Sequence, residues 1–412
     1  MKRLLRTLIL LVVRLIGAPG AYLAARKAQA PVSGKPRILL VRPDHLGDML
    51  LVTPVLDALK THVPDAHITM VVGPWSSEIV ARHPAVDRLL TCPFPGFQRA
   101  PQKALAPYIL LFSYARKLRR GHYDLAINLR PDFWWGAALL YLARIPHRVG
   151  YAIASGTPFL TRALPFQAHE HAAVSNLRLT STALALLGDA PLAEPYTPSA
   201  YPLQFVPTTE ERAWVAERLR NEGIDAETPV VLIHPGSGAA VKLWRSEAWA
   251  SCANALPALL TTPAPARIIL TGGKSERPLL EEIARGMAAS PVMITDASVG
   301  QLAALLGRAV LVLGVDSGPL HLAVAQGTPT VVIFGPTDAR IFGPWGDAGQ
   351  HIVIASTQRC PTCPYIPCGR LDFRPDELAA HPCVRLLPEQ AVLTAIRSLS
   401  ILKQQPGDIE AQ

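Results

Sequence analysis

The sequence predicts two α/β domains, each built on a doubly wound parallel sheet, and three observations support this fold class. Short apolar strands alternate with helical segments in both halves of the chain, as in parallel sheets with crossover helices. A proline-rich stretch at residues 190–207 separates the halves. Several strands end in polar turns, which places a ligand at the carboxyl ends of strands, in a cleft between two facing domains. The 412 residues, half of them hydrophobic, suffice for two cores.

The elements of the N-terminal half follow from local patterns. Strands are expected where apolar residues form short runs between turn signals, at residues 37–41, 67–72, 88–91, 125–128 and 148–150. Helices are expected where apolar residues recur at helical spacing, at residues 54–62, 75–83, 104–120, 134–143 and 174–187.

The C-terminal half repeats this alternation after a connecting helix at residues 209–222. Its strands are expected at residues 230–234, 267–271, 292–295, 310–313, 330–334 and 351–354. Its helices are expected at residues 247–260, 276–289, 299–307, 319–326 and 388–402. We therefore divide the chain into a basic N-terminal segment (1–34), an N-terminal domain (35–195), a linker with its helix (196–228), a C-terminal domain (229–387), a C-terminal helix (388–403) and a frayed tail (404–412).

The basic charge is concentrated near the N-terminus. The net charge is +9, and residues 1–34 contain lysine and arginine but no acidic residue. The apolar run 8–13 is interrupted by Arg14 and is shorter than a membrane span needs. We expect an interfacial helix on the inner face of the cytoplasmic membrane; a signal peptide and a plain surface helix are the alternatives. Nucleic acid is not an expected partner, because no nucleic-acid-binding motif is present and only 6% of residues are aromatic.

The most informative stretch is VLGVDSGPLHLAVAQGTPTVVIFGP, at residues 312–336. A buried strand runs into Asp316, Ser317 and Gly318, and a helix opens with His321 in its first turn. Free amide groups and the positive end of a helix then point at one place, which suits a phosphate group. An ordinary N-capped crossover helix is the alternative interpretation.

Three other strand ends carry polar turns. The first strand runs into RPDHLGD, in which Asp48 would serve as a helix N-cap or as a functional carboxylate. The strand at residues 230–234 runs into a glycine-rich turn containing Ser237 and Gly238, followed by Lys242. The strand at residues 267–271 ends in GGKSE, which would place Glu276 near a ribose. Together with the Asp316 turn, the last two suggest a phosphate-binding edge.

The segments RILLVRPDHLGDMLLVTPVLDALK, HPGSG…KLWRSEAWA, LTGGKSE and VLGVDSGPLHLAVAQGTPTVVIFGPT resemble the successive motifs of glycosyltransferase family nine, the ADP-heptose:lipopolysaccharide heptosyltransferases. The resemblance runs in order from about residue 37 to about residue 397. It implies the glycosyltransferase B fold of two Rossmann-like domains, in which a C-terminal helix often crosses back onto the first domain.

By position, the resemblance makes Asp48 the catalytic base and Lys242 a phosphate-binding lysine. It assigns diphosphate binding to Asp316, Ser317, Gly318 and His321, with Ser237 and Gly238 facing the phosphates and Glu276 on the ribose. The implied reaction is an inverting transfer of a heptose or related sugar from a nucleotide sugar to a glycolipid. No cofactor or catalytic metal is expected, because Lys242 and the amides can stabilise the leaving diphosphate. A nucleotide-sugar 2-epimerase and a non-catalytic binding protein are the alternatives.

The cysteines form a separate question. Four of them, Cys360, Cys363, Cys368 and Cys383, follow the pattern C-x2-C-x4-C-x14-C, with His381 nearby. Four thiols at such spacing can close a tetrahedral zinc site. Buried or redox-labile thiols and disulfides remain alternative interpretations, although disulfides are disfavoured in the cytoplasm.

Overall fold

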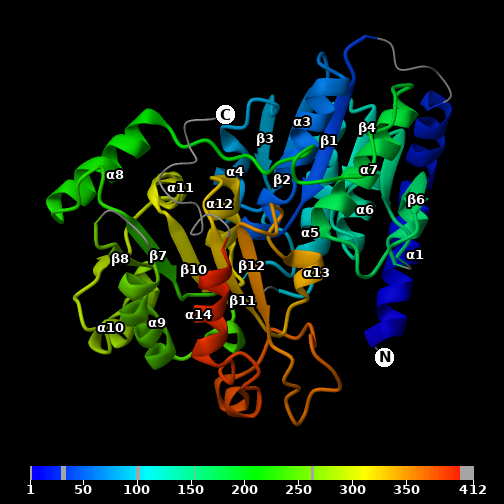
Figure 1. Cartoon of the computed structure of the whole chain (residues 1–412). Coiled ribbons are helices and arrows are strands. Elements are labelled where there is room, and N and C mark those ends of the chain that lie inside the picture. Colours follow the sequence, from blue (N-terminus) through cyan, green and yellow to red (C-terminus); the bar gives the residue numbers. More distant parts are fainter. Residues whose placement is uncertain (1, 29–33, 99–102, 154, 261–263, 400–412) are drawn as a thin grey trace. The chain divides into compact units, whose positions relative to one another are not determined.

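The chain folds into two compact units, Met1–Tyr196 and Thr197–Gln412, each containing one six-stranded sheet (Figure 1). The computed structural model describes residues 2–28, 34–98, 103–153, 155–260 and 264–399. The pairing is parallel throughout both sheets. The predicted fold class, two doubly wound α/β units, is therefore confirmed.

The first unit has the strand order β3-β2-β1-β4-β5-β6. Its strands are β1 (Arg37–Arg42), β2 (His67–Val72), β3 (Arg88–Thr91), β4 (Leu125–Asn128), β5 (His147–Tyr151) and β6 (Arg162–Leu164). Its helices are α1 (Lys2–Lys27), α2 (Leu46–Leu50), α3 (Thr53–His62), α4 (Ser77–Ala81), α5 (Ala106–Arg119), α6 (Trp134–Leu142) and α7 (Ala172–Leu186). The central strands are buried almost throughout, because helices cover both faces of such a sheet.

The second unit repeats this arrangement, with the order β12-β11-β10-β7-β8-β9. Its strands are β7 (Val230–His234), β8 (Arg267–Thr271), β9 (Val292–Ile294), β10 (Leu311–Val315), β11 (Thr330–Phe334) and β12 (His351–Ala355). Its helices are α8 (Thr209–Asn221), α9 (Ser246–Leu259), α10 (Arg277–Arg285), α11 (Val299–Arg308), α12 (Gly318–Ala325), α13 (Ala339–Phe342) and α14 (Glu389–Ser398).

The strand order fixes where a ligand can bind in each unit. The order reverses between β1 and β4 in the first sheet and between β7 and β10 in the second. At such a switch point the loops leave the carboxyl ends of the two neighbouring strands in opposite directions and open a crevice. The loops that follow these four strands are therefore the expected positions of a ligand-binding site.

Some elements differ from the sequence-based expectation. The edge strand β6 and the short helix α2 were not predicted, since β6 has no run of apolar residues and α2 has only five residues. Helix α14 packs onto the second unit itself, where Val392 and Ile396 belong to the hydrophobic core. The predicted tail, residues 404–412, lies outside the described residues.

The N-terminal helix α1 extends over 26 residues of the basic N-terminal segment. It continues through Arg14 and Pro19, and the span Thr7–Lys27 is long and apolar enough, by length and composition, to cross a membrane. The expectation that the apolar stretch is too short is thereby corrected, although core helices and signal sequences pass the same test. Within the first unit, Tyr141 Oη donates a hydrogen bond to the carbonyl oxygen of Arg14 at 2.9 Å. Lys27 Nζ lies 3.0 Å from Asp124 Oδ1, so both halves of the helix are anchored.

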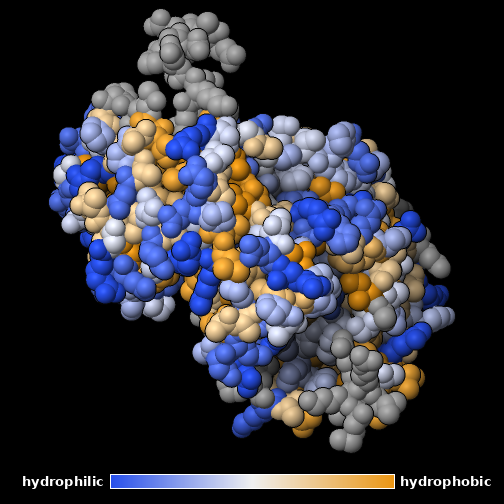
Figure 2. Space-filling model, turned by 60° about the horizontal axis from the view of Figure 1, so that its bottom comes forward, coloured by the Kyte–Doolittle hydropathy of each residue, from blue (hydrophilic) through white to orange (hydrophobic). Residues whose placement is uncertain are grey.

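One side of α1 exposes large apolar side chains. Each is at least 45% exposed: Leu8, Leu11, Val12, Leu15, Ile16, Tyr22 and Leu23. On the face drawn in Figure 2, hydrophobic and hydrophilic residues are interspersed, as is normal for protein surfaces. The alignment of seven apolar residues along one helix is a different arrangement and marks α1 as a candidate interaction surface.

Candidate active site

Asp48 lies in the first turn of α2, in the connection that leaves the carboxyl end of β1. Its side chain is 31% exposed, and Oδ1 lies 3.6 Å from Nη2 of the buried Arg42. Arg42 Nη1 donates hydrogen bonds to Leu129 O at 2.8 Å and to Asn176 Oδ1 at 3.3 Å. A firmly held cation therefore stands beside a carboxylate that remains accessible to a ligand.

A second carboxylate, Asp44, lies in the same loop and was not singled out from the sequence. Its side chain is only 2% exposed. One oxygen lies 2.6 Å from Arg42 Nε, and the other forms an ion pair with Arg130, which follows β4. Because both oxygens face guanidinium groups, Asp44 holds Arg42 and Arg130 in place, and Asp48 is the more exposed of the two carboxylates.

Three aromatic rings lie in the loops that follow β1, β2 and β3. The rings of Trp75 and Phe97 are nearly parallel, and their centroids are 6.4 Å apart. The centroid of the His45 ring lies 5.7 Å from that of Trp75. Arg130 covers the Phe97 ring at 5.0 Å. We call His45, Trp75 and Phe97 the aromatic platform. It was not predicted from the sequence, because its members are far apart in the chain.

In the second unit, Lys242 and Asp316 form an ion pair at the switch point. Lys242 lies in the 3₁₀ turn after β7, and its Nζ is 2.6 Å from Oδ2 of Asp316, which directly follows β10. Thr337, in the loop after β11, donates a hydrogen bond to the same carboxylate oxygen. Both ion-pair side chains are largely buried, at 13% and 8% exposure, so the lysine is held at a defined place.

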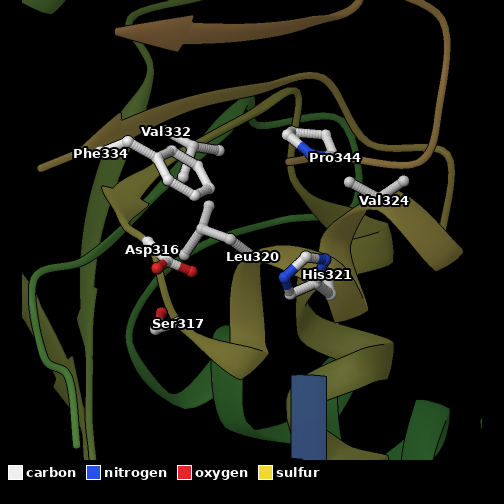
Figure 3. Close-up of a pocket in the computed structure, with 8 residues that line it drawn as sticks. All are labelled: Asp316, Ser317, Leu320, His321, Val324, Val332, Phe334 and Pro344. Carbon is white, nitrogen blue, oxygen red and sulfur yellow. The ribbon is translucent and has the colours of Figure 1, made fainter. Parts of the chain in front are cut away.

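The helix that follows Asp316 presents its N-terminus beside this pair. Ser317 is the N-cap residue of α12, and its side chain forms no capping hydrogen bond. Among the described residues, its buried Oγ has no hydrogen-bond partner. Asp316, Ser317 and His321 line one small pocket, whose apolar wall includes Leu320 and Phe334 (Figure 3). A buried hydroxyl group without a hydrogen-bond partner, at the positive end of a helix, is suited to an anionic ligand.

The glycine-rich turn after β7 lies against Glu276. Glu276 Oε2 accepts a hydrogen bond from the Gly273 amide at 2.7 Å. A Cβ atom added to Gly236 would lie 2.0 Å from Glu276 Oε1, so a larger residue at this position would displace the carboxylate. Ser237 Oγ accepts a hydrogen bond from the Ala239 amide at 3.4 Å, and Gly238 lies within the same turn.

The histidine that ends β7 has a structural role. The buried His234 ring lies 3.0 Å, Nδ1 to Oγ1, from Thr271 at the end of β8. Burial lowers the pKa of His234, although the charge of Glu276 acts in the opposite direction. A neutral imidazole therefore ties the two strand ends together below the glycine-rich turn.

The second unit thus contains eight of the nine residues predicted for catalysis or donor binding. Lys242 contacts Asp316 directly, Ser317, Gly318 and His321 lie at the start of the adjoining helix, and the others lie in the turns after β7 and β8. Asp48 is the one predicted catalytic residue of the first unit. Arg42, Asp44, Arg130 and Thr337 were not predicted.

Comparisons with known proteins agree with this arrangement. The family model described as glycosyltransferase family 9 (heptosyltransferase) matches residues 111–366. Lipopolysaccharide heptosyltransferase 3 of Escherichia coli is 31% identical over 325 residues, 77% of this chain and 88% of the relative.

Two solved structures share the fold. A glycosyltransferase family 9 structure from Veillonella parvula has a TM-score of 0.71 at 22% identity and covers 91% of this chain and all of its own. The E. coli heptosyltransferase WaaC with ADP has a TM-score of 0.61 at 20% identity and covers 88% of this chain and all of its own.

The family match covers every residue of the second unit predicted for catalysis or donor binding, including the Lys242–Asp316 pair, and Asp48 lies before its first residue. The family match covers more than half of the chain, and the match to the relative covers 77% of it. The protein therefore belongs to glycosyltransferase family 9, the heptosyltransferases, and is a glycosyltransferase.

Proposed function

We propose that this enzyme transfers a heptose from ADP-heptose to a lipopolysaccharide-core glycolipid, with inversion at the anomeric carbon. The relatives named for heptose transfer to lipopolysaccharide support the reaction, and the neighbour solved with ADP supports the nucleotide. The observation that carries the proposal is the position of the charged residues. Asp48 follows β1, and Lys242 and Asp316 follow β7 and β10, at the switch points of their sheets.

The second unit holds the donor in this scheme. The diphosphate lies against Lys242 and the N-terminus of α12, with Ser317 Oγ donating to a phosphate oxygen. Charge grows on the leaving diphosphate as the sugar–oxygen bond breaks, and fixed donors already aimed at that place stabilise it. The lysine and the helix supply this stabilisation without a catalytic metal. Glu276, beside Gly236, accepts hydrogen bonds from the ribose hydroxyls.

The first unit activates the acceptor. Asp48 takes the proton of the attacking hydroxyl group as the new glycosidic bond forms, and the nearby Arg42 cation fixes its orientation. Direct attack on the face opposite the leaving diphosphate inverts the anomeric centre. The aromatic platform offers ring surfaces against which the apolar face of an acceptor sugar packs, with Arg130 beside it for acidic groups of the lipopolysaccharide core.

A donor and acceptor screen tests the reaction. Purified enzyme is incubated with a panel of nucleotide sugars, with and without a heptose-containing lipopolysaccharide core, and products are identified by mass spectrometry. The expected product is the core with one added heptose, formed from ADP-heptose and only when the acceptor is present. Conversion of a sugar nucleotide without an acceptor would instead support an epimerase, and binding without any turnover would support a binding protein.

We further propose that α1 holds the enzyme on the inner face of the cytoplasmic membrane. Its exposed apolar side chains can enter the lipid, and the basic residues around them attract anionic headgroups. Lys27 is 58% exposed even while it pairs with Asp124. This arrangement would keep the enzyme where a membrane-anchored acceptor is found.

Replacing Leu11 and Leu15 with aspartate is expected to lower binding to phosphatidylglycerol vesicles by at least about tenfold, because each exposed leucine contributes on the order of 1 kcal/mol when buried in lipid. Co-sedimentation with the vesicles measures the effect. Both side chains are more than half exposed, so the fold is expected to tolerate the change. Leu386→Asp, at an equally exposed leucine of the second unit, is the matched control. Equal binding of the double variant and the wild type would contradict the proposal.

A further inference from the structure

The segment between β12 and α14 contains little regular structure. Of residues 356–388, only Pro375–Ala380 form a helical turn, of the 3₁₀ type. Long loops with little secondary structure are uncommon in compact domains, and those that occur are usually functional or linker segments. This loop contains Cys360, Cys363, Cys368 and Cys383, together with His381.

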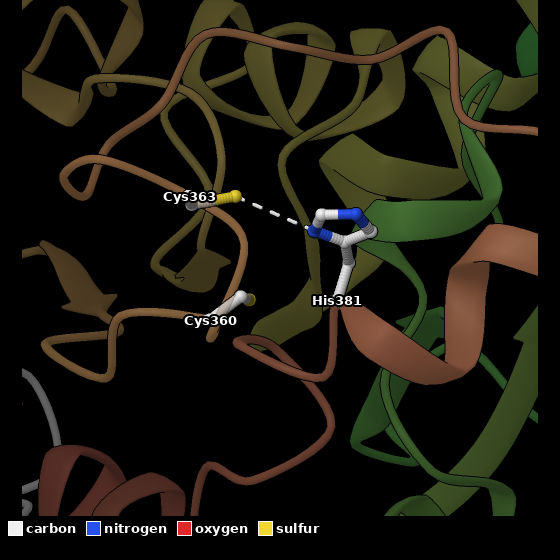
Figure 4. Close-up of side chains that lie close together, drawn as sticks. All are labelled: Cys360, Cys363 and His381. Atoms are coloured by element: carbon white, nitrogen blue, oxygen red, sulfur yellow. Dashed lines mark hydrogen bonds between the residues drawn. The ribbon is translucent and has the colours of Figure 1, made fainter.

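Three of these side chains lie close together. The Sγ atoms of Cys360 and Cys363 and a ring nitrogen of His381 lie within 4.8 Å of one another (Figure 4). Cys363 Sγ is 3.3 Å from Nδ1 of His381. The Cys363 amide also donates a hydrogen bond to Cys360 O at 3.1 Å, so the backbone turns tightly and brings both thiols to the same side. Cys360 and His381 are buried.

The other two thiols border this cluster. The Cys368 thiol lies near enough to Cys363, and the Cys383 thiol near enough to Cys360, for the two members of each pair to interact electrostatically. All four cysteines are free thiols. Four sulfur atoms and one imidazole thus gather in a loop with little regular structure. A set of soft ligands of this kind suits a thiolate-binding transition metal and not Mg²⁺ or Ca²⁺.

We propose that this cluster binds one Zn²⁺ or Fe²⁺ ion in tetrahedral coordination. Cys360, Cys363 and His381 are three of its ligands, and the fourth is a thiolate supplied by Cys368 or Cys383. Metal–sulfur bonds of about 2.3 Å and metal–nitrogen bonds of about 2.1 Å require ligand atoms roughly 3.5–4 Å apart, which small movements of these side chains provide. Four protein ligands leave no open position for substrate, so the site is structural.

The contacts of the loop indicate what the metal stabilises. Ser356 Oγ donates a hydrogen bond to Cys383 O at 2.7 Å, and a Cβ atom on Gly335 would lie 3.4 Å from Cys383 Sγ. Two residues after Gly335, Thr337 donates to Asp316. On the other side, Trp244 Nε1 donates to Leu387 O at 3.0 Å.

The segment 383–387 thus lies between two loops. One carries Thr337, and the other carries Lys242, two residues before Trp244. Metal binding would hold the segment 383–387 in place. It would thereby stabilise the two loops that carry Lys242 and Thr337, which both contact Asp316.

Metal analysis of the full-length enzyme tests this inference independently of transfer activity. The protein is purified under reducing, anaerobic conditions, and zinc and iron are measured by mass spectrometry, with about one equivalent expected in total. Chelator-treated protein then receives Zn²⁺ alone or Fe²⁺ alone, and melting temperature and cleavage by protease within residues 356–388 are followed. Recovery of protection with one ion identifies it, and iron is also visible by its thiolate absorption.

Two variants and a control locate the site. Cys363→Ser and His381→Ala are expected to retain less than about a tenth of the wild-type metal, while Cys252→Ser, a buried and isolated thiol of the same unit, retains all of it. The add-back experiment on wild-type protein remains decisive if a variant fails to fold. Less than about a tenth of an equivalent in fresh protein, with no binding on add-back, would overturn the proposal. So would full metal content in both variants.

Discussion

Replacing Asp48 with asparagine is expected to lower kcat by about 10²- to 10⁴-fold while the affinity for ADP changes by less than about twofold. General base catalysis contributes an effect of this size. Asparagine keeps the shape of the side chain, but it cannot accept the proton of the acceptor hydroxyl. The nucleotide contacts assigned to the second unit are untouched. The measurements are steady-state transfer rates and calorimetric titration with ADP.

Two further carboxylates serve as comparisons for Asp48. Asp65→Asn alters a surface residue that is 78% exposed, and the transfer rate is expected to stay within about twofold. Asp44→Asn removes a charge held between Arg42 and Arg130 and is expected to lower stability as well, because buried cations are left with fewer partners. A kcat of Asp48→Asn within about threefold of the wild type would show that another group is the base.

The sequence predicts the main strands well, for a physical reason. Strands such as β1 and β11 are buried on both faces, so nearly every residue is apolar and their ends are marked by charged or glycine residues. β6 has no such pattern, because it consists of Arg-Ala-Leu and only its last residue is buried. The helix α2 has five residues and includes Gly47, which does not favour a helix.

The candidate site is predicted less completely, because its contacts join distant parts of the chain. Lys242 and Asp316 were each marked by a local turn, but their ion pair depends on β7 lying beside β10. Arg130 reaches Asp44 only because β1 and β4 are neighbours. Nothing in the local sequence of Arg130 or Thr337 reveals such a partner. Only the strand order shows which loops are neighbours, and it places Arg130 and Thr337 beside the switch points of their sheets.

Variants of the Lys242–Asp316 pair can separate the stabilisation of the leaving diphosphate from the stability of the fold. Lys242→Met is expected to lower kcat/KM by about 10²- to 10³-fold, the effect of losing a donor aimed at the developing charge. It should also lower the free energy of unfolding by on the order of 3 kcal/mol, because the largely buried Asp316 loses its cation. Transfer kinetics and urea unfolding measure the two effects.

The double variant Lys242→Met/Asp316→Asn is the matched control, because it removes both charges and leaves neither unpaired. Most of the lost stability is expected to return, since the introduced amide oxygen would still accept a hydrogen bond from Thr337. The transfer rate should stay low, because no cation remains to receive the diphosphate. If the rate returned together with the stability, Lys242 would matter only to the fold, and the leaving group would have to be stabilised by the N-terminus of α12 alone.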